Sequence, residues 1–337
     1  MIFIKMPDYD IFLDEQGTTE LETEIKKIYH YDKLFVVTDE IVFGIYKDQL
    51  IESLPNYKLE FVTIPSGEES KSFDTYKYVI HELIQKGMKR NHMIVAFGGG
   101  VVGDLAGFVA ATLYRGVPFI QIPTTLLAMV DSSIGGKVGI DLIEGKNLIG
   151  SFYNPKLVYI NPKYLDTLPI REYRNGLAEM IKAGLIGDKH LYHYLLQHDK
   201  VTIKEIQIAI QVKRDVVLID PYDKKERMFL NFGHTFGHAI EAKHNYLVYK
   251  HGEAVSYGMI IALAIGVRLG STPKELYDEV KNLLIERELV KEPFMRAHDY
   301  LEQVKKDKKY IGDMLQFVIV TKVGAAKIIH ITESELV

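Results

Sequence analysis

Histidines and one glutamate in the second half of the chain could hold a metal ion. His234 and His238 stand four residues apart in NFGHTFGHAIE, so on a helix they would share a face. His251 follows in HGEAVSYGM, and Glu179 precedes them in NGLAEMIKAG. One carboxylate and up to three imidazoles suit a catalytic zinc-type ion with an open position for substrate. Spacing alone favours His234 and His238 as the ligand pair.

Glycines in AFGGGVVGDLAGF could hold a phosphate. Gly98, Gly100 and Gly103 fit the spacing G-x-G-x-x-G between an expected strand and an expected helix. Glycines let the backbone approach a phosphate, and a helix N-terminus offers free N–H groups. The pattern predicts a nucleotide site, with an ordinary tight turn as the alternative. Upstream, Asp39 ends a strand and is expected either to bind a ribose hydroxyl or to cap a helix.

Cationic and amide side chains are concentrated between residues 115 and 154. Lys137 and Lys146 each follow a glycine, and Asn147 and Asn154 accompany them. Such groups beside glycines suit an anionic ligand that is approached by backbone and side chains together. The alternative, an exposed loop with solvated lysines, is preferred for any single lysine but not for the whole set.

Composition excludes several classes of function. The 41 Lys and Arg are outweighed by 45 Asp and Glu, for a net charge of -4, which argues against a nucleic-acid partner. The chain has no cysteine, so disulfides and thiolate chemistry are excluded and a metal must take His and carboxylate ligands. The longest apolar runs are too short to span a bilayer. Because the N-terminus also lacks a sustained apolar stretch, we expect a cytoplasmic protein with no membrane partner.

The elements that must position these residues change in character along the chain. In the first half, apolar β-branched runs at 34–39, 58–65, 93–100, 119–125 and 156–162 alternate with helical patterns at 41–53 and 72–86. This alternation predicts a Rossmann-like α/β domain over residues 1–161. The second half reads as long amphipathic helices at 171–186, 190–219, 234–243, 253–268 and 273–288, with one strand at 315–324. It predicts a mainly α-helical domain over residues 162–337.

Taken together, the motifs resemble the 3-dehydroquinate synthases, the sugar-phosphate cyclases of the shikimate pathway. GGGVVGDLAGFVAATLYRG, IPTTLLAMVDSSIGGKVGID, GKNLIGSFYNP, NGLAEMIKAG, LNFGHTFGHAIE and HGEAVSYGM occur in the family's order. The resemblance implies bound NAD, a divalent zinc or cobalt ion, and a homodimer. It also implies conversion of 3-deoxy-D-arabino-heptulosonate 7-phosphate, a phosphorylated sugar acid, to 3-dehydroquinate and phosphate, through transient oxidation, β-elimination, reduction and aldol closure.

The resemblance also assigns roles to individual residues. It implies that the metal ligands are Glu179, His234 and His251, and it reassigns His238 to proton transfer or substrate contact. The remaining catalytic positions are Lys137, Lys182 and Asn231. The substrate-contacting positions are Arg115, across a dimer interface, and Asp131, Asn147, Lys213, Arg227 and Lys308, with Lys309 as the alternative to Lys308. The positions that contact NAD are Asp39, Glu68, Lys71, Gly99, Gly100, Asp104, Thr124, Thr125, Lys146 and Thr167.

Two other kinds of enzyme share this plan. Another sugar-phosphate cyclase, such as 2-deoxy-scyllo-inosose synthase, would use the same scaffold on a different sugar. A metal-dependent polyol or alcohol dehydrogenase would share NAD and metal but would release NADH. The set of lysines and arginines, which suits a phosphate and a carboxylate, favours a cyclase.

Overall fold

The computed structural model describes residues 1–336 apart from residues 16–18, 223–225, 306–309 and 312–313. The chain divides into two compact units, Met1–Leu168 and Pro169–Val337. The boundary predicted after residue 161 falls at the start of a short 3-10 helix, η4 (Pro162–Thr167), which lies within the first unit.

The first unit is built on a seven-stranded sheet in the order β1-β2-β9-β6-β5-β3-β4. Its strands are β1 (Ile2–Lys5), β2 (Asp10–Leu13), β3 (Lys33–Asp39), β4 (Lys58–Ile64), β5 (Met93–Gly98), β6 (Phe119–Pro123) and β9 (Leu157–Ile160). All neighbouring strands pair in parallel except β1 and β2, which form an antiparallel edge. The central strand β5 is buried along its whole length, as expected for a parallel strand covered on both faces.

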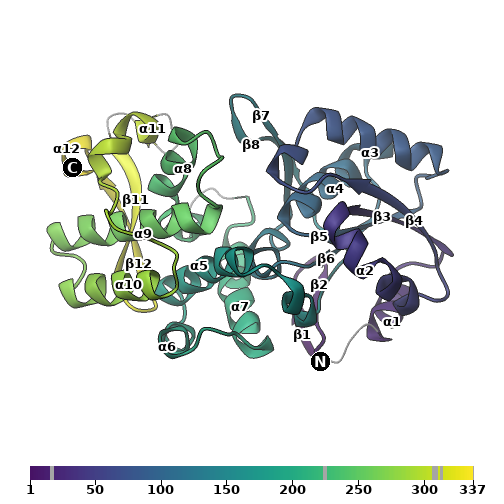
Figure 1. The fold of residues 1–337 in the computed structure, drawn as a ribbon, viewed down its shortest axis with the longest axis horizontal. Helices are drawn as coiled ribbons and strands as arrows, with labels where there is room; N and C mark the ends of the chain where they lie inside the picture. The colour runs from purple at the N-terminus through teal and green to yellow at the C-terminus, as the bar shows by residue number, and fades with distance from the viewer. Residues whose placement is uncertain (16–18, 223–225, 306–309, 312–313, 337) are drawn as a thin grey trace. The chain divides into compact units, whose positions relative to one another are not determined.

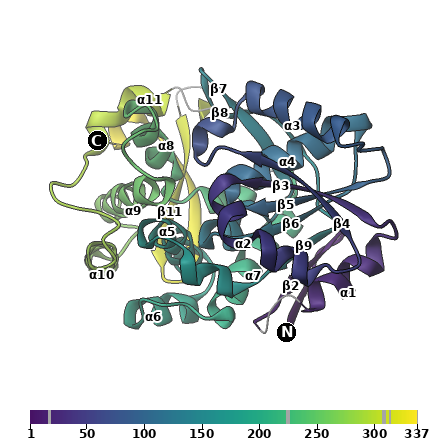
Figure 2. The ribbon, with the colours of Figure 1, turned by 45° about the vertical axis from the view of Figure 1, so that its right-hand side comes forward.

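Helices cover both faces of this sheet. They are α1 (Thr19–Ile28), α2 (Glu40–Ser53), α3 (Phe73–Gln85) and α4 (Gly100–Thr112). Because alternate side chains of a strand point to opposite faces, Ile94 and Ala96 of β5 pack into one core cluster with α3 and α4. Phe97 points to the other face and contacts Tyr46 of α2. α3 and α4 thus lie along one side of the strands and α2 along the other (Figure 1, Figure 2).

A β-hairpin interrupts the alternation of strands and helices in the first unit. After β6 come a short π-helix, η3 (Ala128–Ser132), and two antiparallel strands, β7 (Lys137–Leu142) and β8 (Gly145–Phe152). No strand was predicted for this stretch. Glycines weaken the strand pattern there, yet Gly139 is needed because an added Cβ would lie 2.5 Å from the carbonyl oxygen of Ile149.

The second unit is mainly helical. Its helices are α5 (Ile170–Ile186), α6 (Lys189–Gln197), α7 (Ile203–Ile219), α8 (His234–Lys243), α9 (His251–Arg268), α10 (Lys274–Glu286), α11 (Leu301–Lys305) and α12 (Glu333–Leu336), with 3-10 helices η5 (Glu226–Asn231) and η6 (Ala297–Tyr300). A small antiparallel sheet joins β10 (Tyr310–Ile311), β11 (Met314–Lys322) and β12 (Ala325–Ile331). α5 is buried without interruption from Asn175 to Ile186, which makes it a core helix.

The predicted fold class, a Rossmann-like α/β unit followed by a mainly helical one, is confirmed. Two details differ from the sequence analysis. The helix predicted over 190–219 is broken into α6 and α7, because Thr202 and Glu205 form a capping box that starts a new helix. β12, the partner of the predicted strand β11, was not predicted. Among the described residues, no helix is both long enough and apolar enough to cross a membrane.

Candidate active site

Glycines and polar residues gather where the parallel strands of the first unit end. β3 ends at Asp39, β5 ends at Gly98, and Thr124 and Thr125 follow β6 directly. The carboxyl ends of parallel strands share one edge, which is where open α/β sheets bind ligands. α4 begins at Gly100, separated from the end of β5 by one residue, so its N-terminal N–H groups lie at the same edge.

Close packing explains why the turn before α4 consists of glycines. A Cβ added to Gly98 would lie 2.7 Å from Val102 Cγ2, and one added to Gly103 would lie 2.7 Å from Gln121 Oε1. At Gly99 a Cβ would lie 3.1 Å from the methyl group of Thr125. The glycines of the G-x-G-x-x-G pattern therefore let α4 approach the sheet, in addition to leaving its backbone open to a ligand.

Asp39 and Thr167 are both engaged in local hydrogen bonds. Asp39 caps α2, because its Oδ1 accepts hydrogen bonds from the backbone N–H groups of Ile41 and Val42, both at 3.0 Å. The capping alternative for Asp39 is therefore present in the structure. The hydroxyl of Thr167 is hydrogen-bonded to that of Tyr46 on α2.

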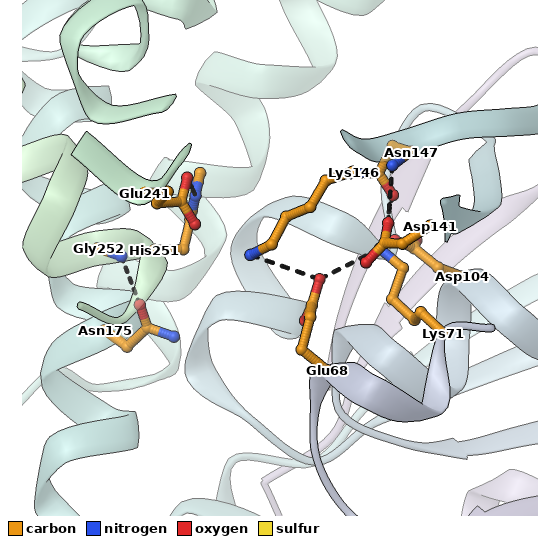
Figure 3. A network of polar contacts seen from close by, with 10 residues as sticks. All are labelled: Glu68, Lys71, Asp104, Asp141, Lys146, Asn147, Asn175, Glu241, His251 and Gly252. Carbon is orange, nitrogen blue, oxygen red and sulfur yellow. Dashed lines mark hydrogen bonds and ion pairs between the residues drawn. The ribbon is translucent and has the colours of Figure 1, made fainter. Parts of the chain in front are cut away.

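Lys71 is the centre of a polar network in the first unit (Figure 3). Its Nζ donates to Asp104 Oδ2 at 2.9 Å and to Asn147 Oδ1 at 2.6 Å. Carboxylate oxygens of Glu68 and Asp141 lie 3.7 and 3.8 Å from the same nitrogen. Burial alone would lower the pKa of Lys71, but the nearby carboxylates outweigh it and raise that pKa. Lys71 therefore stays protonated.

The same network ties the β7–β8 hairpin to the rest of the first unit. The backbone N–H of Asp141 donates to the carbonyl of Lys71 at 2.7 Å, and that of Asn147 donates to Asp141 Oδ1 at 2.7 Å. Lys146 Nζ lies 3.6 Å from Glu68 Oε1. The structure thus brings together five residues that the sequence analysis singled out for NAD or substrate: Glu68, Lys71, Asp104, Lys146 and Asn147.

Three other predicted residues of the first unit lie in a turn, in η3 and at the start of the β7–β8 hairpin. Arg115 is exposed, and its backbone has a positive φ of 66°, next to Tyr114 at 52°. Two such residues in sequence are uncommon for side chains other than glycine and mark a specially shaped turn. Asp131 lies in η3, and Lys137 is the exposed first residue of β7.

Glu179, His234 and His251 converge in the second unit. Glu179 Oε1 lies 3.6 Å from His234 Nε2 and 3.7 Å from His251 Nε2. One donor atom from each of the three residues lies within 4.8 Å of the others. The carboxylate comes from α5, and the imidazoles come from the first residues of α8 and α9.

The chemistry of this donor set fits a divalent ion. Glu179 is buried, and Lys182 Nζ lies against its Oε2 as an ion pair. Its Oε1, the oxygen nearest His234 and His251, accepts no hydrogen bond from the described residues. A buried carboxylate oxygen without a donor is costly, and a metal ion held between Oε1 and the two imidazoles would compensate it. Burial, followed by the charges of Lys182, His251 and His238, lowers the pKa of His234 well below its usual value. His234 is therefore neutral near pH 7, as a metal ligand must be.

Close contacts between the helices hold the three side chains in place. The backbone N–H of Gly252, next to His251, donates to Asn175 Oδ1 at 2.5 Å, and Asn175 lies one turn before Glu179 on α5 (Figure 3). A Cβ at Gly252 would collide with the carbonyl oxygen of Asn175. Where α8 approaches α9, a Cβ at Gly237 would lie 3.1 Å from Val255 Cα. Small residues thus allow the close approach that the convergence needs.

His238 lies beside this group. Its ring centre is 5.3 Å from that of His234 and 6.1 Å from that of His251, and the side chain is exposed. It shares a second group of possible ligand atoms with Glu241 and His251, but not the group that contains Glu179. The structure therefore groups His234 with His251 around Glu179, whereas the i, i+4 spacing alone favoured His234 with His238.

The second unit also places several of the predicted cationic and amide residues. Lys182 and Lys213 are buried on α5 and α7. Arg227 is buried in η5, where its guanidinium donates to the carbonyl of Pro221 at 2.8 Å. Asn231 ends η5, three residues before His234. The predicted phosphate contact of Lys308 lies outside the described residues.

Comparison with known proteins identifies the family. Residues 61–175 match the family model for the 3-dehydroquinate synthase N-terminal domain, and residues 176–310 match the model for its C-terminal domain. The 3-dehydroquinate synthase of Clostridium botulinum (strain Alaska E43 / Type E3) is 43% identical over 333 residues, which cover 96% of this chain and 95% of the relative. The chain belongs to the 3-dehydroquinate synthase family.

Solved structures of other cyclases share the fold of this family member. A 2-deoxy-scyllo-inosose synthase complexed with carbaglucose-6-phosphate, NAD+ and Co2+ is 25% identical, with a TM-score of 0.84, and the match covers 97% of this chain and 95% of that one. A 2-epi-5-epi-valiolone synthase from Streptomyces hygroscopicus subsp. jinggangensis 5008, with NAD+ and Zn2+ bound, is 24% identical, with a TM-score of 0.85 and 99% and 96% coverage.

The sequence analysis missed residues that support the site. Glu241 and Asp141 each contact a residue of the predicted set, and Asn175 accepts a hydrogen bond from Gly252, the neighbour of His251. Asn175 could have been found, because it precedes Glu179 by one helical turn and so shares its face. Glu241 ends the HAIE motif, but nothing in the spacing shows that its carboxylate faces His251. Asp141 could not be found because the hairpin itself was not predicted.

Proposed function

We propose that this chain is a 3-dehydroquinate synthase that converts 3-deoxy-D-arabino-heptulosonate 7-phosphate to 3-dehydroquinate and phosphate. The observation that carries the proposal is the convergence of Glu179, His234 and His251 in a chain that matches both halves of the family. The identity of 43% to a 3-dehydroquinate synthase, against 25% to the 2-deoxy-scyllo-inosose synthase, favours the first activity over that of its nearest rival.

Two cofactors are part of this proposal. When bound by Glu179, His234 and His251, a zinc or cobalt ion would act as a Lewis acid toward the substrate hydroxyl. NAD, held by the glycine turn with Thr124 and Thr125, would supply a temporary hydride acceptor. The remaining residues of the nucleotide set are Asp39, Glu68, Lys71, Asp104, Lys146 and Thr167.

The chain's own side chains would hold substrate and move protons. We assign proton transfer to His238, whose exposed ring lies beside the donor group, and to Lys182, whose Nζ lies against Glu179. Lys137 and Asn231 complete the catalytic set. Cations and amides suit the phosphate and carboxylate of the substrate, and these contacts are assigned to Arg115, Asp131, Asn147, Lys213, Arg227 and Lys308.

We also propose that the enzyme is a cytoplasmic homodimer. The exposed Arg115, at a turn of two successive positive-φ residues, is the residue that would reach the partner subunit's substrate. This arrangement follows the family expectation, and the exposure of Arg115 supports it.

The function is tested by offering the heptulosonate phosphate to the zinc-loaded protein with NAD. Released phosphate and absorbance of NADH are followed together. We expect stoichiometric release of phosphate without accumulation of NADH, because the hydride returns to the substrate within each turnover. Glucose 6-phosphate, whose carba analogue is bound in the related synthase, serves as the control substrate and should release no phosphate.

Two results would contradict the proposal. Stoichiometric build-up of NADH would indicate a dehydrogenase. Phosphate release from glucose 6-phosphate, but not from the heptulosonate, would indicate the other cyclase.

A further inference from the structure

Glu241 is a buried carboxylate that lies behind one of the proposed metal ligands. It belongs to α8, and only 2% of its surface is exposed. Its Oε2 lies 3.3 Å from Nδ1 of His251. Figure 3 shows Glu241 beside the His251 ring, close to the Asn175–Gly252 contact that holds the start of α9.

The two nitrogens of the His251 ring face different carboxylates. Nε2 lies 3.7 Å from Glu179, in the proposed metal group, while Nδ1 faces Glu241. An ionised carboxylate can only accept hydrogen bonds, so the proton of a neutral His251 belongs on Nδ1. The lone pair of Nε2 is then directed toward the donor group of Glu179 and His234.

The Nδ1 of His234 faces a different kind of hydrogen-bond acceptor. Its Nδ1 lies 3.2 Å from the backbone carbonyl oxygen of Phe232, and its Nε2 lies 3.6 Å from Glu179 Oε1. Both rings therefore present Nε2 to Glu179 and have Nδ1 anchored by an acceptor. The acceptor is uncharged for His234 and a carboxylate for His251. A carboxylate partner fixes the ring and also raises its basicity as a ligand.

We propose that Glu241 is a positioning residue for the metal site, acting through His251. It selects the tautomer that leaves Nε2 as the ligand atom, sets the plane of the ring, and strengthens the bond from His251 to the ion. This inference rests on the metal site of the proposed function and adds to it a residue that does not touch the ion.

A second ion is the competing explanation for the same geometry. His238, Glu241 and His251 form a group of possible ligand atoms within 4.8 Å of one another. An ion bound by this second group would need Nδ1 of His251 as a ligand, while Nε2 binds the ion held by Glu179 and His234. A neutral imidazole has only one unprotonated nitrogen, so it cannot bind both ions. The positioning role therefore requires one ion per chain.

The test compares Zn2+ and Co2+ binding by metal-free wild-type protein and by Glu241→Gln and Glu241→Ala. Affinity for Zn2+ alone is measured by competition with a chromophoric chelator, and stoichiometry by elemental analysis. Glutamine keeps the size of the side chain and one acceptor oxygen but loses the charge, so we expect the Kd for Zn2+ to rise about 10-fold in Glu241→Gln. Alanine removes the acceptor as well, so we expect the Kd to rise about 100-fold in Glu241→Ala. The visible absorption bands of bound Co2+ should shift in both variants, because the ligand field of His251 changes.

A matched control separates this role from a general effect of removing a buried glutamate. Glu205 of the same unit is 5% exposed and accepts a hydrogen bond from the backbone N–H of Thr202 at 3.0 Å. Glu205→Gln should lower the melting temperature without changing Zn2+ affinity or the Co2+ spectrum. Circular dichroism of the metal-free proteins shows whether each variant is folded; if Glu241→Ala is not, the isosteric Glu241→Gln decides.

The outcomes separate this inference from the metal site itself. One ion per wild-type chain, with weaker binding and a shifted spectrum in Glu241→Gln, supports the positioning role. Wild-type affinity and spectrum in Glu241→Gln overturn it and leave the metal site intact. Two ions per wild-type chain overturn it in favour of a second site. Failure of the wild-type chain to bind Zn2+ overturns both this inference and the proposed ligand set.

Discussion

At the scale of single residues, Lys71 balances the charges of the first unit's polar network. Its Nζ is the hydrogen-bond donor to Asp104 and Asn147, and Glu68 and Asp141 lie nearby. Burial raises the pKa of Asp104, and the charge of Lys71 opposes that rise. The proposed contact of Lys71 with NAD would therefore be made by a side chain that also holds the hairpin and α4 together.

Replacing Lys71 with methionine should destabilise the first unit. The nearby carboxylates would lose their buried counter-charge, which costs about 3 kcal/mol of the free energy of unfolding. Urea denaturation measures the loss at neutral pH. The loss should shrink as the pH is lowered, because these carboxylates then take up protons and no longer need the lysine.

Lys27 provides the comparison for Lys71. It is 61% exposed and pairs with Glu24 at 2.6 Å, so Lys27→Met should cost less than about 1 kcal/mol. If Lys71→Met is no more destabilising than Lys27→Met, Lys71 does not have the proposed structural role.

At the scale of elements, three helices must approach one another closely for the metal ligands to meet. α5 provides Glu179, and α8 and α9 each provide a histidine at their first residue. Asn175 holds the start of α9 through the N–H of Gly252. The position of a histidine at the first residue of a helix depends on how that end of the helix packs. A change in the backbone contact at the start of α9 therefore moves the metal ligand His251.

A methyl group at Gly252 should separate the ligands. The added Cβ would collide with the carbonyl oxygen of Asn175 and lie 2.9 Å from Ala178 Cβ, so the start of α9 must move away from α5. We expect Gly252→Ala to cost about 1–3 kcal/mol of stability. We also expect Zn2+ affinity to fall at least about 10-fold, in line with the loss of other support for metal ligands.

Gly44 offers a matched alanine substitution. It lies inside α2, and an added Cβ would meet nothing within 4 Å. Gly44→Ala should therefore stabilise the protein by about 0.5–1 kcal/mol and leave Zn2+ binding unchanged. Wild-type metal affinity in Gly252→Ala would show that the helix contact does not position His251.

At the scale of the whole molecule, the two proposed cofactors are assigned to separate units. The glycine turn and the Lys71 network belong to Met1–Leu168, and the donor group belongs to Pro169–Val337. Each unit has its own hydrophobic core. Damage to the metal ligands should therefore leave the nucleotide site folded.

Glu179→Ala should abolish turnover and most of the metal affinity while NAD still binds. Elemental analysis measures the metal content, calorimetry measures NAD binding, and phosphate release measures turnover. Unchanged metal content would refute the ligand assignment. Loss of NAD binding together with the metal would contradict the independence of the two sites.

Much of the fold was predictable because its signals are local. Buried parallel strands such as β3 and β5 are continuous apolar runs, and the helices between them repeat apolar residues at helical spacing. The family motifs were likewise read directly from the chain. The β7–β8 hairpin was not predicted because its glycines remove the side chains on which a strand pattern depends.

The sequence alone determined which donor types are present and, through the resemblance, which residues are the proposed ligands. Spacing could say only that His234 and His238 share a helical face. Tertiary packing decided that Glu179 meets His234 and His251, and that Glu241 lies behind His251. The physical reason is that these neighbours come from three helices, whose approach depends on backbone contacts at Gly252 and Gly237 that no periodicity in the sequence records.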